Sequence, residues 1–406
     1  MNPAQRMSAF FAHVAQTSDA PMGIVVEAAY GSTVRAVGGN EYVDLLAGIG
    51  VAAVGHGRHE VLAAIEGQAR RHLHVMVYGE FVQDAQVELA SRLAGLLPKA
   101  LQSVYFTSSG TEAVEGALKL ARKATGRTRL LAFRGGFHGD TFGSLSVGGN
   151  PVYRDPFLPL LPDVEFLSFN DTGSLAAIDE RAAAVIVEPV QAEAGVIVPE
   201  PGFLAALRER CSRARALLIF DEVITGFGRT GSLFAFEREG VVPDVLVLAK
   251  ALGGGLPLGA FIASKQLMSS LAHDPPLAHV TTFGGHPLSC AAGLAALNII
   301  ISEKLPARAE RMGALFAELL VGVLPSHRLC AIRRSGLLLG LRMDDPGFVA
   351  RFTAECRREG LIVGWTLHDD KVVRLTPPLV ITEAEIQESA QRMARAAARA
   401  DTDARR

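Results

Sequence analysis

A single lysine, Lys250, ends a short apolar run and is followed at once by a glycine-rich turn at residues 253–255. When such a lysine is removed from water its pKa falls, and the neutral amine can attack a carbonyl group. The glycines allow the backbone to pass close to a bulky ligand. A Walker loop is excluded, because there the lysine follows the glycines. The pattern therefore predicts an amine nucleophile beside a ligand-binding turn.

A second group that could do chemistry is the carboxylate of Asp221, which follows the apolar run at residues 217–220. In a parallel sheet, the carboxyl ends of the strands form the edge at which ligands bind. Burial raises the pKa of a carboxyl group, so a buried Asp221 should face a cation. An ordinary solvated acid at the end of a strand explains the pattern equally well.

The third feature is the run Ser109-Gly110-Thr111, which lies between a strand-like segment at 103–107 and a helical pattern. The free backbone N–H groups at the start of a helix, together with nearby hydroxyl groups, form a binding site for phosphate. Ser109 and Glu112 also have the spacing of a capping box. An ordinary capped helix is therefore an equally good explanation of this run alone.

The three features have one common explanation. Pyridoxal phosphate (PLP) bonds a lysine through its aldehyde, pairs its ring nitrogen with an acid, and needs a helix end for its phosphate. Two other motifs compete weakly. Residues 48–53 fit the GxGxxA form of a dinucleotide fingerprint, but they follow strands that read as antiparallel and open no helix. The histidine pairs at 56–59 and 72–74 lack a carboxylate or cysteine at ligand spacing, so we expect no metal site.

The sequence resembles the class III PLP-dependent aminotransferases of fold type I, including acetylornithine, ornithine and ω-amino acid aminotransferases. The segments that match this family follow one another over most of the chain, at residues 108–113, 136–139, 188–195, 221–231, 248–255, 281–287 and 374–379. Asp221 and Lys250 are 29 residues apart, as the family pattern expects.

The resemblance implies a role for each matching residue. Lys250 would form the Schiff base with the cofactor and carry a proton during the reaction, and Asp221 would keep the ring nitrogen protonated. Phe137 would stack on one face of the ring and Val223 would pack against the other. The other cofactor-binding residues implied in the same chain are Ser109, Gly110, Thr111, His138 and Glu188.

Two further implications concern the partner subunit and the substrate. Thr282 would reach the phosphate bound by the partner subunit, so the resemblance implies a homodimer with a shared active site. Arg374 would bind the carboxylate of a substrate through the fork of its guanidinium. Glu193 would pair with Arg374 when no carboxylate is present, which lets one pocket accept an amine and a 2-oxo acid in turn.

Three departures from the family pattern bear on the substrate. Ile224 stands where many members have Gln, which removes a possible hydrogen-bond donor near the cofactor ring. Asp140 stands where acetylornithine and ornithine aminotransferases usually carry Arg, so a carboxylate clamp is lost. Ile49 stands where some ornithine-type relatives have Tyr. These departures favour an amine or ω-amino acid donor without a second carboxylate clamp over acetylornithine.

The function implied is transfer of an amino group from an amine or ω-amino acid to a 2-oxo acid, pyruvate or 2-oxoglutarate. An aminomutase or a decarboxylase on the same fold remains an alternative, because the motifs do not determine which bond of the substrate breaks. A cofactor-binding protein without catalysis would be expected to lack Lys250 or Asp221, and both are present. The sequence does not identify the donor, the preferred acceptor or the pathway, nor distinguish a dimer from a tetramer.

The elements that position these residues predict an α/β fold. Between about 55 and 300, seven short apolar runs alternate with helical patterns, which is typical of a mainly parallel sheet covered on both faces. The apolar runs are at 103–107, 130–133, 164–166, 184–187, 217–220, 245–248 and 261–263.

Both ends of the chain predict a smaller α+β domain. Near the start of the chain, the pattern predicts antiparallel strands at 24–26, 33–37 and 42–46. Near the other end, it predicts strands at 333–342 and 372–375. We therefore expect three segments: 1–50 in the small domain, 51–305 as the large PLP-binding domain, and 306–406 completing the small domain.

Composition agrees with a globular enzyme and sets limits on its partners. Of 406 residues 49% are hydrophobic, and 40 basic residues against 42 acidic ones leave a formal charge of −2, which gives no basic excess for nucleic acid. The longest apolar stretch, 288–301, is shorter than the roughly 20 residues of a membrane span. The four cysteines form no CxxC pair and no secretory signal is visible, so we expect a cytoplasmic enzyme.

Overall fold

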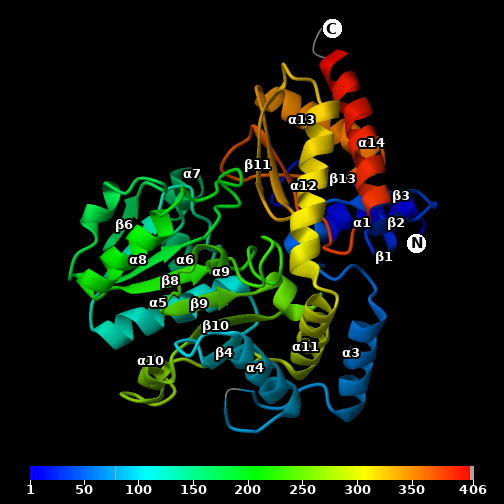
Figure 1. The fold of residues 1–406 in the computed structure, drawn as a ribbon. Coiled ribbons are helices and arrows are strands. Elements are labelled where there is room, and N and C mark those ends of the chain that lie inside the picture. Colours follow the sequence, from blue (N-terminus) through cyan, green and yellow to red (C-terminus); the bar gives the residue numbers. More distant parts are fainter. Residues whose placement is uncertain (78, 403–406) are drawn as a thin grey trace.

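The computed structural model describes residues 1–77 and 79–402. Its centre is a seven-stranded sheet, left in Figure 1, in the order β4-β10-β9-β8-β7-β5-β6. The strands are β4 (Ser103–Thr107), β5 (Arg129–Phe133), β6 (Val164–Leu167), β7 (Ala182–Val187), β8 (Leu217–Asp221), β9 (Val245–Leu248) and β10 (Gly259–Ala263). Only β10 runs against its neighbours. The predicted mainly parallel sheet of seven strands is therefore confirmed.

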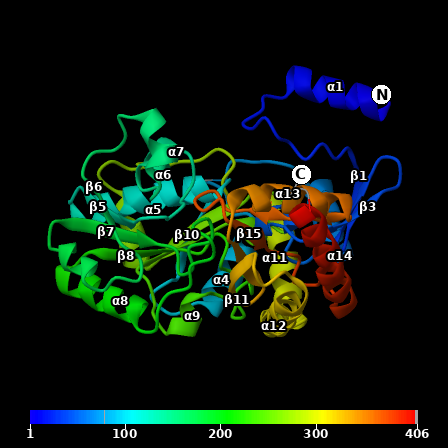
Figure 2. The same cartoon turned by 90° about the horizontal axis from the view of Figure 1, so that it is seen from above.

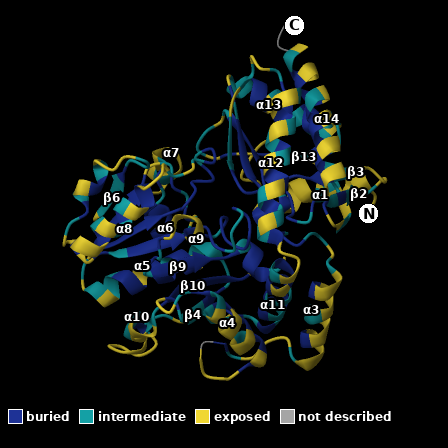
Figure 3. Cartoon of the chain, in the orientation of Figure 1, coloured by how far each residue is buried: buried dark blue, intermediate teal, exposed yellow. Residues whose placement is uncertain are grey.

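This sheet is buried on both faces, which explains its uninterrupted apolar strands. One face packs on α5 (Gly110–Thr125), and the other packs on α8 (Phe203–Ala214). Figure 3 shows these strands as a continuous buried layer. Helix α5 buries Ala113, Ala117 and Ala121 and ends at Gly126, whose φ of 67° suits the left-handed position after a helix.

The second part of the molecule contains two four-stranded sheets, right in Figure 1. One has the order β1-β2-β3-β13 and the other β11-β12-β15-β14. Their strands are β1 (Val26–Tyr30), β2 (Thr33–Ala36), β3 (Glu41–Asp44), β11 (Leu329–Ser335), β12 (Leu338–Met343), β13 (Leu361–Ile362), β14 (Gly364–Trp365) and β15 (Val372–Leu375). Because β3 pairs in parallel with β13, both ends of the chain build this smaller part. The boundaries at 50/51 and 305/306 stay a prediction.

Two strand predictions for this smaller part were wrong in detail. The first strand occupies 26–30 instead of 24–26. The segment 333–342 is not one strand but the two arms of the β11–β12 hairpin, because Gly336 has a φ of 57° and reverses the chain.

The remaining helices connect and cover these sheets. They are α2 (Ala47–Gly50), α3 (His59–Arg71), α4 (Asp84–Leu96), α6 (Phe142–Ser146), α7 (Pro151–Arg154), α9 (Phe236–Glu239), α10 (Lys265–Ser269), α11 (Pro287–Ser302), α12 (Leu305–Val323), α13 (Pro346–Arg358) and α14 (Glu383–Thr402). Helix α1 (Pro3–His13) buries no residue and stands apart from the rest of the chain in Figure 2. Across residues 1–77 and 79–402, no single helix is long and apolar enough to cross a membrane, although α11 and α12, bent by 67°, pass that test as a pair.

Candidate active site

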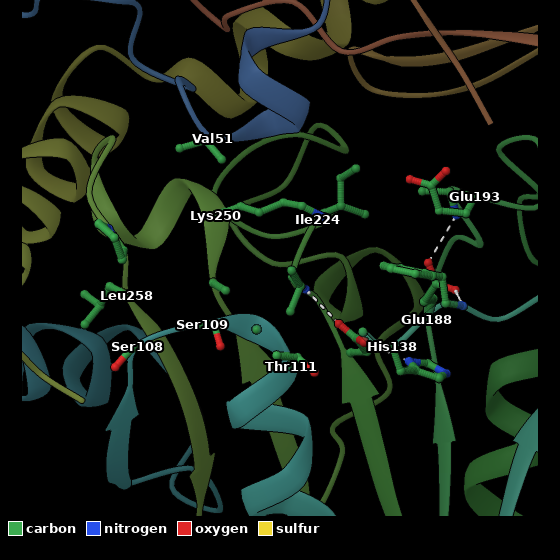
Figure 4. Close-up of a pocket in the computed structure, with 18 of the residues that line it drawn as sticks. Val51, Ser108, Ser109, Thr111, His138, Glu188, Glu193, Ile224, Lys250 and Leu258 are labelled. Carbon is green, nitrogen blue, oxygen red and sulfur yellow. Dashed lines mark hydrogen bonds and ion pairs between the residues drawn. The ribbon is translucent and has the colours of Figure 1, made fainter. Parts of the chain in front are cut away.

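A cavity of about 430 Å³ lies beyond the carboxyl ends of β8 and β9. Six segments of the chain contribute the residues that line it: Val51, Ser108–Thr111, Phe137–Gly139, Glu188, Ala192, Glu193, Asp221, Val223, Ile224, Ala249, Lys250 and 255–258. Ten of the twelve predicted site residues thus meet around one space, and Thr282 and Arg374 are not among the lining residues. Figure 4 shows Lys250 reaching across the cavity, with Ser109 and Thr111 at the helix end and Glu188 and Glu193 to one side.

Lys250 follows β9 in a left-handed conformation, with a φ of 48°. This conformation is uncommon outside glycine and often occurs at functional sites. Burial lowers the pKa of the Lys250 ammonium, and the negative charge of Glu193 offsets part of that effect. Burial therefore favours the neutral form of an amine that lines the cavity, which is the form that a nucleophile requires.

Asp221 forms a buried pair with His138 on the other side of the cavity. The His138 Nδ1 lies 2.8 Å from the Asp221 Oδ2, and both side chains are almost fully buried. Burial alone would lower the pKa of His138, but the hydrogen bond with Asp221 and the charges of Asp221 and Glu188 raise it overall. The pair keeps a negative oxygen at the cavity wall without leaving its charge unbalanced.

Glu188 is the third acid of this group. Its carboxylate accepts hydrogen bonds from the backbone N–H groups of Phe137 (2.9 Å) and Ala192 (3.2 Å). Burial raises the Glu188 pKa to about 7, against the opposing charge of His138. Glu188 therefore fixes the backbone that carries Phe137 on one wall of the cavity.

The start of α5 supplies backbone N–H groups to the cavity. Ser109 caps the helix by accepting from the Glu112 N–H at 3.3 Å, while the first N–H groups of any α-helix have no intrahelical acceptor. A Cβ atom on Gly110 would lie 3.1 Å from the Val223 Cγ1 and 3.3 Å from the Ala249 Cβ. Any larger residue would therefore be tightly packed where the helix end, Val223 and the chain before Lys250 meet.

The sequence did not predict a group of hydroxyls that lies beside this helix end. The Thr111 Oγ1 lies 2.7 Å from both the Thr141 Oγ1 and the Ser144 Oγ, and the Thr141 hydroxyl donates to Glu115 at 2.6 Å. The run Thr141–Ser144 directly follows the matched segment at 136–139, which was the available signal. These contacts orient the Thr111 hydroxyl at the helix end.

Arg374 and Glu193 form an ion pair in which both side chains are buried. The Glu193 Oε1 pairs with the Arg374 Nη1, and its Oε2 accepts the Leu367 N–H at 3.0 Å. Glu193 lines the cavity and Arg374 is not among its lining residues, so the carboxylate is the member of the pair that faces the cavity. The Arg374 Nε has no hydrogen-bond partner within the described chain. The pairing implied by the sequence is present in the fold.

Thr282 lies outside the cavity of its own chain and is exposed in the segment before α11. Asp140 is also exposed, and Ile49 is 46% exposed. Ile224, in contrast, lines the cavity and packs with Val190, Ala192 and Val196 in a small apolar cluster. The wall beside Lys250 at Ile224 is therefore apolar.

The residues present fit PLP. Asp221, paired with His138, can face a ring nitrogen. The helix end at Gly110, which has little room for a Cβ, can take a phosphate. The Lys250 side chain lines the same cavity. This donor set offers one partner for each reactive part of the cofactor.

Comparison of the whole chain with known proteins agrees with the chemistry of this site. Residues 14–397 match the family model described as aminotransferase class-III, so the chain belongs to the class III aminotransferases, which catalyse transamination with PLP. It is 45% identical over 357 residues to the acetylornithine aminotransferase of Methanopyrus kandleri, covering 88% of this chain and 90% of that protein.

Solved structures give the same result. The ornithine aminotransferase of Toxoplasma gondii ME49 is 31% identical with a TM-score of 0.92, covering 99% of this chain and 96% of that one. A PLP-bound amine transaminase from an uncultivated Pseudomonas species is 32% identical with a TM-score of 0.87, covering 95% and 98%. All three relatives are aminotransferases, and they give no support to an aminomutase or a decarboxylase.

Proposed function

We propose that this aminotransferase takes its amino group from an amine or ω-amino acid and gives it to a 2-oxo acid, pyruvate or 2-oxoglutarate. The observation that carries the proposal is that Glu193 lines the cavity, whereas the Arg374 with which it is paired does not. The ionisable groups that line the cavity are three acids, Glu188, Glu193 and Asp221, and two bases, His138 and Lys250. Such a wall suits a positively charged amine and repels a carboxylate.

The residue roles follow from this geometry. When bound, PLP supplies an aldehyde and an electron-withdrawing ring. Lys250, whose pKa is lowered, would hold the cofactor covalently and would then move a proton at the substrate carbon. Asp221, oriented by His138, keeps a negative charge beside the ring nitrogen.

Other residues would position the cofactor and exclude water from it. The N–H groups of Gly110 and Thr111, with the hydroxyl of Ser109, bind the phosphate. Phe137 and Val223, which both line the cavity, would enclose the ring and exclude water from it. Thr282 is exposed and does not line its own cavity, which supports a homodimer in which it would complete the phosphate site of a second copy.

The acceptor half-reaction requires a different arrangement of the ion pair. A 2-oxo acid brings a carboxylate that fits the guanidinium fork of Arg374. To reach it, the carboxylate has to displace Glu193 and take over the charge balance of the buried guanidinium. One cavity thereby accepts two chemically opposite substrates in turn.

The named relatives limit the donor to a primary amino group but differ in what surrounds it. Acetylornithine and ornithine carry a carboxylate at the far end, whereas a simple amine does not. The exposed Asp140 adds negative charge where an arginine clamp is expected in the first two groups. We therefore propose a donor without a tightly bound far carboxylate, and a cytoplasmic location remains a prediction.

Measuring the two half-reactions separately tests the proposal. Arg374→Ala should weaken the 2-oxo acid half-reaction by about 2–5 kcal/mol, because a desolvated charge pair with the substrate is lost. Its amine half-reaction should change much less. Glu193→Gln should have the opposite effect: it should favour the half-reaction of substrates with carboxylates and weaken that of simple amines.

Stopped-flow absorbance of the cofactor with single substrates gives both rates, after a screen of amines against pyruvate and 2-oxoglutarate. Equal losses in both halves for Arg374→Ala would mean that the arginine supports the pocket and does not select substrates. Fast turnover of acetylornithine together with poor turnover of simple amines would contradict the proposed donor.

A further inference from the structure

The hairpin that carries Arg374 also holds the carboxylate opposite it. Strands β14 and β15 pair antiparallel, with Gly364 opposite Arg374, and residues 366–371 form the loop between them. From this loop, the Leu367 N–H donates to the Glu193 Oε2 at 3.0 Å, and the His368 N–H donates to the Glu193 backbone oxygen at 3.0 Å. Glu193 is therefore bound by the guanidinium from the strand and by the backbone from the loop.

The loop is tied in turn to the large sheet domain. The Tyr153 hydroxyl, from α7, donates to the Leu367 carbonyl oxygen at 2.8 Å. The His368 Nδ1 lies 2.8 Å from the carbonyl oxygen of Gly135, and its ring is 5.6 Å from that of Tyr153. Glu193, Gly135 and Tyr153 all belong to the large domain, so the loop is held across the domain boundary.

We propose that Tyr153 and the Leu367 backbone form a latch that keeps Glu193 on Arg374, and that this latch sets the balance between amine and carboxylate substrates. The inference rests on the exchange at Arg374 described under the proposed function. It assigns specificity to Tyr153, a positioning residue that does not line the cavity.

The physical reason is the hydrogen bond that Glu193 leaves behind. When a substrate carboxylate displaces Glu193, the Leu367 N–H loses its acceptor and must move towards water or another acceptor. The Tyr153 hydroxyl opposes that movement because it fixes the carbonyl of the same residue. Removal of the hydroxyl should let the loop move and so make Arg374 easier to reach.

The chain contains its own reporter for this movement. Trp365, the only tryptophan in the sequence, lies in β14 directly before the loop and is 47% exposed. A shift of residues 366–371 changes the surroundings of the indole, so its emission reports the loop independently of catalysis.

The test uses the holoenzyme and glutarate, a dicarboxylate with no amino or oxo group, so that binding is measured without reaction. Tyr153→Phe should bind glutarate about three- to tenfold more tightly than the wild type, as expected for the loss of one opposing hydrogen bond. Trp365 emission should change as glutarate saturates the wild type. Tyr30→Phe, which removes a hydroxyl bonded to Glu41 away from the site, should behave as the wild type.

Two further variants separate the latch from the proposed function. If Arg374→Ala abolishes glutarate binding and Glu193→Gln tightens it, while Tyr153→Phe equals the wild type, only the latch is overturned. If Arg374→Ala binds glutarate as tightly as the wild type, Arg374 does not bind the substrate carboxylate. The proposed role of Arg374 and the latch are then both overturned. Unchanged Trp365 emission at saturating glutarate also overturns the latch, since Glu193 then leaves without moving the loop.

Discussion

At the scale of single residues, the charge of Lys250 is set by opposing neighbours. Burial favours the neutral amine, and the positive charge of Arg374 acts in the same direction. The carboxylates of Glu193, Asp221 and Glu188 favour the ammonium. Because the pKa is lowered overall, burial outweighs the carboxylates, and the amine becomes available at a lower pH than for a lysine in water.

Covalent loading of the cofactor-free protein with PLP should therefore increase with pH through a midpoint below 10.5, the ordinary pKa of lysine. Glu193→Gln should lower that midpoint further, because it removes a negative charge that favours the ammonium and leaves Arg374 unpaired. The measurement is the loading rate from cofactor absorbance between pH 7 and about 10. Lys250→Ala is the control and should show no covalent loading. A higher midpoint in Glu193→Gln would contradict this account of the charges.

At the scale of elements, α5 must lie very close to the sheet to bring its first turn to the cavity. Gly116 allows this contact: a Cβ there would lie 2.7 Å from the Phe261 Cδ1 and 2.9 Å from its Cζ. Phe261 is fully buried in β10, so it has little room to move. The position of α5, and with it the turn that we propose to bind phosphate, depends on the absence of one methyl group at residue 116.

Gly116→Ala should destabilise the fold by about 1–3 kcal/mol through overpacking, although alanine is the better helix former. The matched control is Gly67→Ala in α3, where a new Cβ meets no atom within 4 Å. That variant should gain roughly 0.5–1 kcal/mol from helix propensity alone. Chemical denaturation of both variants measures the difference, and a stabilised Gly116→Ala would show that α5 can retreat from β10.

At the scale of the whole molecule, one chain does not carry all of the proposed site. Thr282 is exposed and lies away from its own cavity, although the segment around it matches the family pattern. A residue proposed to serve the phosphate must then act in a second copy. Closed twofold dimers make such an exchange reciprocal, because each copy gives and receives the same residue.

Mixing two inactive variants tests this exchange. In a mixed dimer of Lys250→Ala and Thr282→Ala, the subunit that keeps Lys250 receives an intact Thr282 from its partner. Random exchange should therefore restore about a quarter of the wild-type activity at limiting PLP, since half of the dimers carry one complete site. Each variant alone is the control. If mixing restores nothing while exchange is verified by mass, Thr282 serves its own chain.

The sequence predicted the large sheet well because its strands are buried on both faces and therefore read as short apolar runs. Lys250 and Asp221 could be found for the same reason, since each is a charged residue at the end of such a run. The β11–β12 hairpin was missed because its strands carry Arg333, Arg334 and Arg342 and its turn has no Asn-Gly signal.

The contacts around Glu193 could not be predicted for another reason. The Leu367 N–H and carbonyl are backbone groups that every residue has, and Tyr153 is 214 positions away in the sequence. Only the fold brings together the β14–β15 loop, α7 and the turn after β7 that carries Glu193.

The pairing of β3 with β13 also determines when the small domain can form. Val43 pairs with Leu361, so more than 300 residues have to be synthesised between the two strands of one sheet. Pairing of such distant segments is slow, because the whole loop must close before any contact is gained. During synthesis, β3 emerges early with an edge that has no partner, and unpaired edges promote association with other chains. The sheet begun by the first fifty residues is therefore completed among the last, and the growing chain depends on protection of that edge until residue 361 has emerged.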